Sequence, residues 1–324
     1  MKLAVLADIH GNLPALEAVT HELERLQPDC VALNGDLING APFSAAVIDF
    51  VRGRDWLVVR GNHEFYYLDW GTSRAVPGCE DAERWGQLHW LVDHLPREQG
   101  DYLAGLPDER ALYFPGTQPL RMTHGVPGHN RVGFYHGQSD EKVLAKVQDL
   151  PEATLVSAHT HVQIDRIVCR TDDRADALET TPHGDFFTGK AMDVRHCWHI
   201  INPGSVGLPL NGDERAQFAV LEDVPEDQVP GGWQVTHYQI PYDRRPTLAA
   251  FADSGMLAAG GVISRLFYWE VVTALPEITS FYRWAYENDY NPDDSIRNAF
   301  AAYIAATGRD EYVHGLDPLV QRGL

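Results

Sequence analysis

Five short polar clusters contain the residues of this chain that are best suited to bind metal ions. They are Asp8-Ile9-His10, Gly35-Asp36, Gly61-Asn62-His63-Glu64, His124-Gly125 and His159-Thr160-His161. A carboxylate and an imidazole two positions apart, just past a strand end, can both turn toward one ion. Carboxylate, imidazole and amide oxygen together suit Mn, Fe, Zn or Co better than Ca or Mg. The clusters therefore predict a transition-metal site, provided that the fold brings them together.

Each cluster follows an apolar run that is typical of a buried strand. Strands are predicted at 2–7, 30–33, 56–59, 119–123 and 154–157, and helices at 13–26 and 43–51 separate the first three. This alternation indicates a parallel sheet with right-handed crossovers. Because sites in open α/β sheets form at the carboxyl ends of strands, we expect the clusters to converge on one crevice.

The rest of the chain has a mixed region followed by a helical one. Helices are predicted at 81–95 and 140–147, and strands at 111–114, 162–169, 196–201, 216–221 and 233–240. The polar stretch 170–193 is predicted to be an insertion or arm. From Arg245 onward the pattern is helical and aromatic, which favours a core or a subunit interface over a base-stacking surface. A helix at 293–307 is predicted to be capped by Asp293 or Asp294.

In type and order, the five clusters resemble the sequence blocks of the calcineurin-like metallophosphoesterase superfamily. Those blocks are D-x-H, G-D, G-N-H-[DE], H and G-H-x-H. Residues 8–19 and 202–207 resemble its bacterial and archaeal branch of small phosphodiesterase-like members. The resemblance covers roughly residues 1–240 and implies an α/β fold, a four-layer αββα sandwich of two mixed sheets. The predicted domains are 1–244, with insertions at about 65–116 and 170–194, and a C-terminal helical extension, 245–324, packed on it.

The resemblance also implies a role for each clustered residue. The cofactors would be two divalent transition-metal ions, with Mn favoured and Fe, Zn, Ni or Co as alternatives. A hydroxide bridging the ions would attack the phosphorus, and His63, which is not a ligand, would donate a proton to the leaving group. Glu64 would orient His63. Asp36 would bridge the two ions. One ion would be held by Asp8, His10 and His161. The other would be held by Asn62, His124 and His159.

The implied function is dinuclear-metal-dependent hydrolysis of phosphoric esters, with phosphodiesters preferred over monoesters. A protein Ser/Thr phosphatase or a dinucleoside-polyphosphate hydrolase is an alternative. Those enzymes usually carry Asp-Arg-Gly after Gly-Asp, whereas residues 37–40 here are Leu-Ile-Asn-Gly. A catalytically silent metal-bound scaffold is an alternative of another class, and the intact ligand set argues against it. Two departures from the family pattern are Ala158, in place of glycine, and Leu208, which puts a substrate contact in doubt.

Charge and cysteine usage narrow the expected partners and location. The 46 acidic and 26 basic residues give a net charge of -20, which argues against a broad nucleic-acid surface. A metal cluster can reverse the field inside a cleft, so the expected partner is a small phosphate ester.

With no bilayer-spanning apolar run and no signal-peptide pattern, we expect no membrane association and a cytoplasmic protein. The C-terminal helices offer an interface for a homo-oligomer. Reduced thiols are expected at Cys30, Cys79, Cys169 and Cys197.

Overall fold

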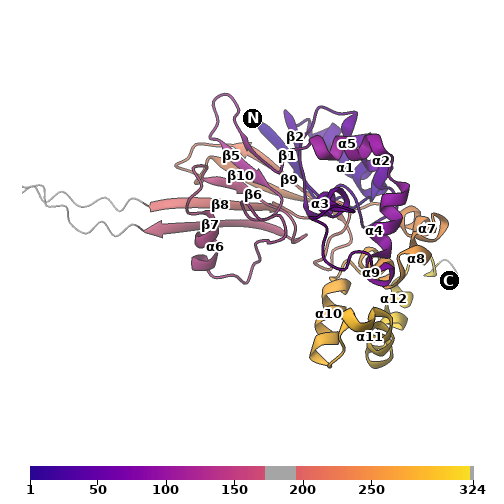
Figure 1. Ribbon diagram of the computed structural model, residues 1–324. Helices are drawn as coiled ribbons and strands as arrows, with labels where there is room; N and C mark the ends of the chain where they lie inside the picture. Colours follow the sequence, from indigo (N-terminus) through magenta and orange to yellow (C-terminus); the bar gives the residue numbers. More distant parts are fainter. Residues whose placement is uncertain (172–194, 322–324) are drawn as a thin grey trace, which may run out of the picture.

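The computed structural model describes residues 1–171 and 195–321, and two five-stranded sheets form the centre of this part (Figure 1). The first sheet has the order β10-β9-β1-β2-β3. Strands β1, β2 and β3 pair in parallel, while β9 pairs antiparallel with β1 and β10. Its strands are β1 (Lys2–Leu6), β2 (Cys30–Asn34), β3 (Leu57–Val59), β9 (Ala216–Asp223) and β10 (Trp233–Ile240).

The second sheet is also mixed and has the order β4-β5-β6-β8-β7. Strands β5, β6 and β8 are parallel, with antiparallel β4 and β7 at the edges. Its strands are β4 (Glu109–Leu112), β5 (Leu120–Thr123), β6 (Thr154–Val156), β7 (Gln163–Thr171) and β8 (Arg195–Pro203). The predicted arm between β7 and β8 lies outside the described residues, except for its first two positions.

The sheets pack face to face, and helices cover both outer faces. Between the sheets lies an apolar layer that includes Val5 and Ala219 from the first sheet and Met122 and Ile201 from the second. Helices α1 (Leu13–Leu26), α2 (Ser44–Arg52) and α5 (Arg97–Gly105) cover the first sheet. Helix α6 (Asp140–Val147) covers the second. This arrangement confirms the predicted αββα sandwich.

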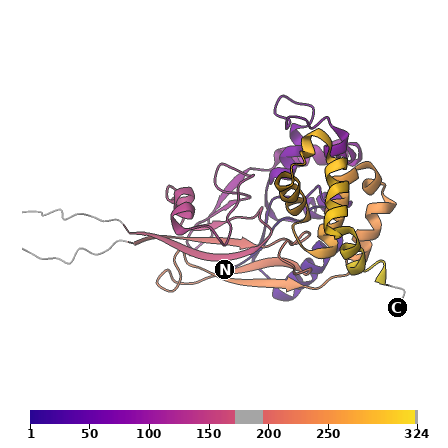
Figure 2. The same cartoon turned by 90° about the horizontal axis from the view of Figure 1, so that it is seen from below.

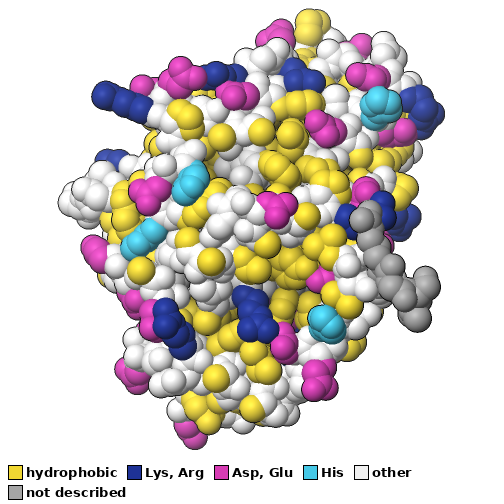
Figure 3. Space-filling model, turned by 90° about the vertical axis from the view of Figure 1, so that its right-hand side faces the viewer, with side chains coloured by type: hydrophobic (Ala, Val, Ile, Leu, Met, Phe, Trp, Pro, Cys, Tyr) yellow, Lys and Arg dark blue, Asp and Glu magenta, His cyan; other side chains and the backbone are white. Residues whose placement is uncertain are grey.

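A helical region follows β10 and packs beside the sandwich (Figures 1 and 2). It contains α7 (Arg245–Asp253), α8 (Met256–Ala259), α9 (Gly261–Thr273), α10 (Glu277–Glu287), α11 (Pro292–Thr307) and α12 (Arg309–Leu316). Helix α4 (Ala82–His94) packs against α9, and many of the aromatic residues form the core of the region, as expected. On the face in Figure 3, hydrophobic side chains lie among charged ones. Within the described residues, no helix has the length and apolar character needed to cross a membrane.

Two local predictions were wrong. Helix α11 is capped by Asn291, whose side chain accepts a hydrogen bond from the backbone N–H of Asp293 at 3.1 Å, and not by an aspartate. Cys169 and Cys197 are not reduced thiols but form a disulfide between β7 and β8. The two cysteines are directly opposite each other in the register of this strand pair, a relation that their spacing along the chain does not reveal.

Candidate metal centre

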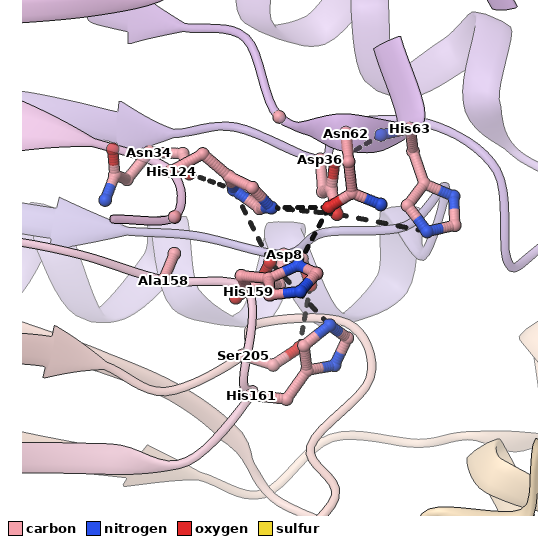
Figure 4. Close-up of polar contacts among 12 residues, drawn as sticks. Asp8, Asn34, Asp36, Asn62, His63, His124, Ala158, His159, His161 and Ser205 are labelled. Carbon is pink, nitrogen blue, oxygen red and sulfur yellow. Dashed lines mark hydrogen bonds and ion pairs between the residues drawn. The ribbon is translucent and has the colours of Figure 1, made fainter. Parts of the chain in front are cut away.

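The strands that precede the five polar clusters end on the same side of the sandwich, and the clusters meet there (Figure 4). Donor atoms of six predicted ligands form two groups, within each of which all atoms lie within 4.8 Å of one another. Asp36 belongs to both groups. The amide oxygen of Asn62 joins the second group, 2.8 Å from Nδ1 of His159 and 3.0 Å from Nε2 of His124. The groups are Asp8, His10, Asp36 and His161, and Asp36, His124 and His159.

Three of the four imidazoles are oriented by backbone carbonyls. Because a carbonyl only accepts, each ring must carry a proton on Nδ1, so that in the neutral ring the lone pair for a cation is on Nε2. The pairs are His10 with Asn39 (2.7 Å), His124 with Asn34 (2.8 Å) and His161 with Leu208 (2.5 Å). At Leu208, which departs from the family pattern, it is the backbone carbonyl and not the side chain that makes this contact.

Asp8 gives an independent indication of a cation. Its carboxylate is fully buried, and neither oxygen has a hydrogen-bond partner among the described residues. Imidazole nitrogens of His161 and His124 stay 3.7 Å and 3.9 Å away. Burial raises the pKa of Asp8 well above its ordinary value. Because an unpaired buried carboxylate is costly, these residues fit a divalent ion that would neutralise Asp8.

Asp36 and His124 form a buried ion pair, with 3.2 Å between Oδ2 and Nε2. Burial opposes the charge on Asp36, but the neighbouring imidazoles of His124, His63 and His10 hold its pKa well below the ordinary value. Burial likewise opposes the charge on His124, but Asp36 and Asp8 raise its pKa to about 10. Since a ligating imidazole must be neutral, metal binding at His124 must release a proton.

Five predicted ligands adopt left-handed backbone conformations, which are uncommon outside glycine. The φ angles are 54° at Asp8, 50° at His10, 54° at Asp36, 69° at His159 and 58° at His161. Each such residue costs about 1–3 kcal/mol and persists where the surroundings hold it, often at functional sites. Ala158 is not among the residues with positive φ, so its replacement of the family's glycine is tolerated as expected.

The prediction that Glu64 orients His63 was wrong. The buried carboxylate of Glu64 instead accepts hydrogen bonds from the backbone N–H groups of Gly61 (2.7 Å), Asp36 (2.9 Å) and Leu37 (2.8 Å). It ties the loop after β2 to the start of α3 (Asn62–Asp69). The sequence signal for this role is a glutamate three residues after Gly61, the spacing of a capping box.

His63 lies beside both donor groups without belonging to either. Its Nε2 is 4.0 Å from Oδ2 of Asp36, and its ring centroid is 4.6 Å from that of His10. Its backbone N–H donates to Oδ1 of Asp36 at 2.8 Å. Burial lowers the pKa of His63 to about 3, so the imidazole is neutral at pH 7.

The end of β8 and the turn that follows it make hydrogen bonds to the loops of the site. The hydroxyl of Ser205 donates to the carbonyl of Asp8 at 2.7 Å. The amide of Asn202 donates to the carbonyl of Ala158 at 3.1 Å and to the hydroxyl of Thr160 at 3.0 Å. These contacts hold the loops that carry the donors.

Comparison with known proteins covers the part of the chain that carries the clusters. The model of the calcineurin-like phosphoesterase family matches residues 1–163, which include all seven predicted ligands. An uncharacterized protein of Methanocaldococcus jannaschii is 22% identical over 225 residues, 68% of this chain and 82% of its own length. A metallophosphoesterase from Sphaerobacter thermophilus is 26% identical with a TM-score of 0.55, covering 80% of this chain and 100% of that one. A hypothetical protein from Pyrococcus horikoshii shares the fold, with a TM-score of 0.61, 18% identity, and 82% and 97% of the two chains covered.

Proposed function

Because this chain belongs to the calcineurin-like phosphoesterase family and is a metal-dependent phosphoric ester hydrolase, we propose that it hydrolyses phosphodiesters in preference to monoesters. The metal-dependent chemistry rests on the pair of donor groups that share Asp36, together with the buried carboxylate of Asp8, which accepts no hydrogen bond from the described residues. A single ion would not account for seven convergent donors from five separate loops. Two ions that share a carboxylate would use all of them.

The donor set supports two divalent transition-metal ions, with Mn favoured and Fe, Zn, Ni and Co as alternatives. It consists of imidazoles, carboxylates and one amide oxygen, with no thiolate. When bound, the ions supply the Lewis acid that activates water and neutralises the phosphoryl oxygens. One ion would be held by Asp8, His10 and His161, the other by Asn62, His124 and His159, and Asp36 would be shared.

We assign the role of proton donor to His63. Its Nε2 faces the donor groups, whereas its Nδ1 is buried without a hydrogen-bond partner among the described residues. Since burial keeps the ring neutral, one nitrogen carries the proton. To act as an acid the ring must first take up a second proton. The Nε2 proton of that imidazolium would lie on the side where an ester oxygen would leave, and its transfer to that oxygen would return the neutral ring.

Room for two ester groups supports a diester as substrate. A cavity of about 320 Å³ is lined by His63 and Tyr66, and a wider one of about 860 Å³ is lined by Arg60 and Arg131. The guanidinium of Arg131, which lines the wider cavity, lies 4.6 Å from the ring centroid of Tyr66, which lines the smaller one, so the two cavities are neighbours. A monoester would leave one of them unused.

The test is turnover by the Mn²⁺-loaded protein on bis(p-nitrophenyl) phosphate and on p-nitrophenyl phosphate. We expect a higher kcat/KM for the diester and loss of both activities after chelation. Metal analysis of the purified protein identifies the native ions. A higher kcat/KM for the monoester would overturn the diester preference. Bound metal without hydrolysis of either ester would favour the scaffold alternative.

A further inference from the structure

The cavity of about 320 Å³ lies between α3, α4, α9 and α10, next to the donor groups. We call it the aromatic slot because four aromatic side chains line it: Tyr66, Trp85, Phe267 and Tyr282. His63 also lines the slot, and its ring centroid is 4.6 Å from that of His10. The volume is at the small end for ligand pockets, which suits one small group of a substrate and not a polymer.

The rings of the slot are spaced so that a further ring would add contacts of the same kind. The ring centroids of His63 and Tyr66 are 5.4 Å apart, those of Tyr66 and Trp85 5.7 Å, and those of His63 and Phe267 6.3 Å. All three pairs meet edge to face, the favoured geometry of aromatic pairs. The slot therefore suits a planar aromatic group.

Arg84 and Trp85 bring hydrogen-bond donors to the wall of the slot. Nε of Arg84 and Nε1 of Trp85, both on residues that line the slot, have no hydrogen-bond partner among the described residues. Asp293 holds another nitrogen of the same guanidinium, Nη1, at 2.6 Å, which fixes the head group in place. Buried donors without acceptors are costly, and both unpaired atoms are donors. The side chain of Arg84 is 25% exposed, so its guanidinium offers a donor to acceptor atoms of a group in the slot, such as the ring nitrogens and oxygens of nucleobases or substituents of an aryl group.

The C-terminal helices are fixed to the loop that leads from Asp36, so the slot is preformed. Gln87 in α4 donates from Nε2 to the carbonyl of Gly40 at 3.0 Å and accepts at Oε1 from the hydroxyl of Ser264 in α9 at 2.8 Å. At Gly86, an added Cβ would lie 2.4 Å from the carbonyl oxygen of Ala259. Only a glycine therefore allows α4 to approach the C-terminal helices this closely, and the helical region forms part of the site's surroundings.

We propose that the aromatic slot binds a planar, acceptor-bearing aromatic group of the substrate and thereby selects phosphate esters of aryl or nucleoside type. This inference rests on the proposed phosphoesterase function, because the slot adjoins the groups assigned to catalysis. Esters that carry only alkyl groups or a sugar leave the aromatic walls of the slot uncontacted.

The test measures binding and turnover separately. Calorimetry on the Mn²⁺-loaded protein compares phosphates that differ in the ring: phenyl phosphate with methyl phosphate, and adenosine 5′-monophosphate with ribose 5-phosphate. We expect about tenfold tighter binding of the ring-bearing member of at least one pair. A preference in the nucleotide pair identifies a nucleobase as the ring, and a preference confined to the phenyl pair identifies a simple aryl group. Equal affinity within both pairs would overturn the proposal.

Two variants test whether the slot is the cause of any preference. Ile263→Trp fills the slot from α9, and Phe267→Ala removes one of its walls. Both should reduce the ring preference to about twofold or less. Tyr312→Ala, at a side chain that is 49% exposed on α12, is the matched control and should retain it. Retention of the preference in both slot variants would refute the proposal. If the protein hydrolyses phosphate esters but shows no preference for ring-bearing ones, only the proposed role of the slot is refuted. If it prefers ring-bearing phosphates but hydrolyses no ester, only the proposed function is refuted.

Discussion

Glu64 binds neither a predicted ion nor the substrate, yet it holds the loop that carries Asp36. Its carboxylate is fully buried and is the acceptor for four backbone N–H groups, three at 2.7, 2.9 and 2.8 Å and that of Ile38 at 3.4 Å. Glu64→Ala leaves these donors unpaired, at about 1–3 kcal/mol each. We expect the free energy of unfolding to fall by about 3 kcal/mol or more, and Mn²⁺ affinity to fall about 10- to 100-fold. Urea unfolding and Mn²⁺ calorimetry measure the two effects.

Glu64→Gln is the control for that experiment, because it keeps the size of the side chain and one acceptor oxygen. Its losses should lie between those of the wild type and Glu64→Ala. Wild-type metal affinity in Glu64→Ala would show that the loop holds its shape without this carboxylate.

His63 is the other residue whose role is open to a direct measurement. Since it is not among the predicted ligands, His63→Ala should retain the metal content of the wild type. If His63 donates a proton, its loss should lower kcat by about 10²- to 10⁴-fold on an ester with an alkyl leaving group. The loss should be much smaller with p-nitrophenolate, which leaves without protonation. An equal loss on both esters would contradict the role of proton donor.

At the scale of elements, Glu270 joins α9 to α10, and its oxygen accepts the backbone N–H of Ile278 at 3.1 Å. Burial, with the nearby charge of Glu277, raises the pKa of Glu270 from 4.5 to about 8. Between pH 4.5 and about pH 8, the carboxyl of Glu270 loses its proton in the unfolded chain but keeps it in the folded chain. This group therefore lowers the free energy of unfolding as pH rises, by about 1.4 kcal/mol per pH unit. Below pH 4.5 the carboxyl is protonated in both states and has no such effect.

The variant Glu270→Gln removes the titration and keeps the hydrogen-bond acceptor. We expect urea unfolding between about pH 5 and pH 7.5 to show a shallower fall in stability than in the wild type. The comparison is between the two slopes, because other groups titrate equally in both proteins. Parallel slopes would show that Glu270 is ionised in the folded chain.

Two helices with local start signals were predicted from the sequence to the residue. Helix α1 follows the cap Asn12 and an early proline, and α6 follows the cap Ser139. Strand β4 was predicted two positions too late, because its limits depend on pairing with β5 and on the turn that begins at Phe114. The disulfide between β7 and β8 was missed for the same reason, since only the strand register brings the two cysteines together.

At the scale of the whole molecule, the site also divides into residues that local motifs predict and residues that depend on how distant elements pack. The seven residues predicted as ligands could be expected to lie together because each follows a strand within a short motif, and parallel strands end on one side. The contacts of Glu64 with the loop after β2, and the aromatic slot, could not be predicted, because they arise from the packing of elements far apart in sequence. Gln87 illustrates this: its partners Gly40 and Ser264 lie in the loop after β2 and in α9.

The final prediction concerns the charge of the whole molecule, which is -20, and the two carboxylates that it buries at one point. Mn²⁺ at about 100 times its Kd should stabilise the folded chain by about 2.7 kcal/mol over the chelated protein, raising Tm by roughly 5 °C. Calorimetric scans measure the shift. Mg²⁺ at equal concentration controls for general screening and should raise Tm less, because imidazole donors favour transition metals. Asp36→Asn, which removes the shared carboxylate, should lose most of the Mn²⁺-specific shift, whereas the remote Glu270→Gln should retain it. Equal shifts with Mn²⁺ and Mg²⁺ in the wild type would mean that the cations act through surface charge, and the assignment of two ions to these donors would then be wrong.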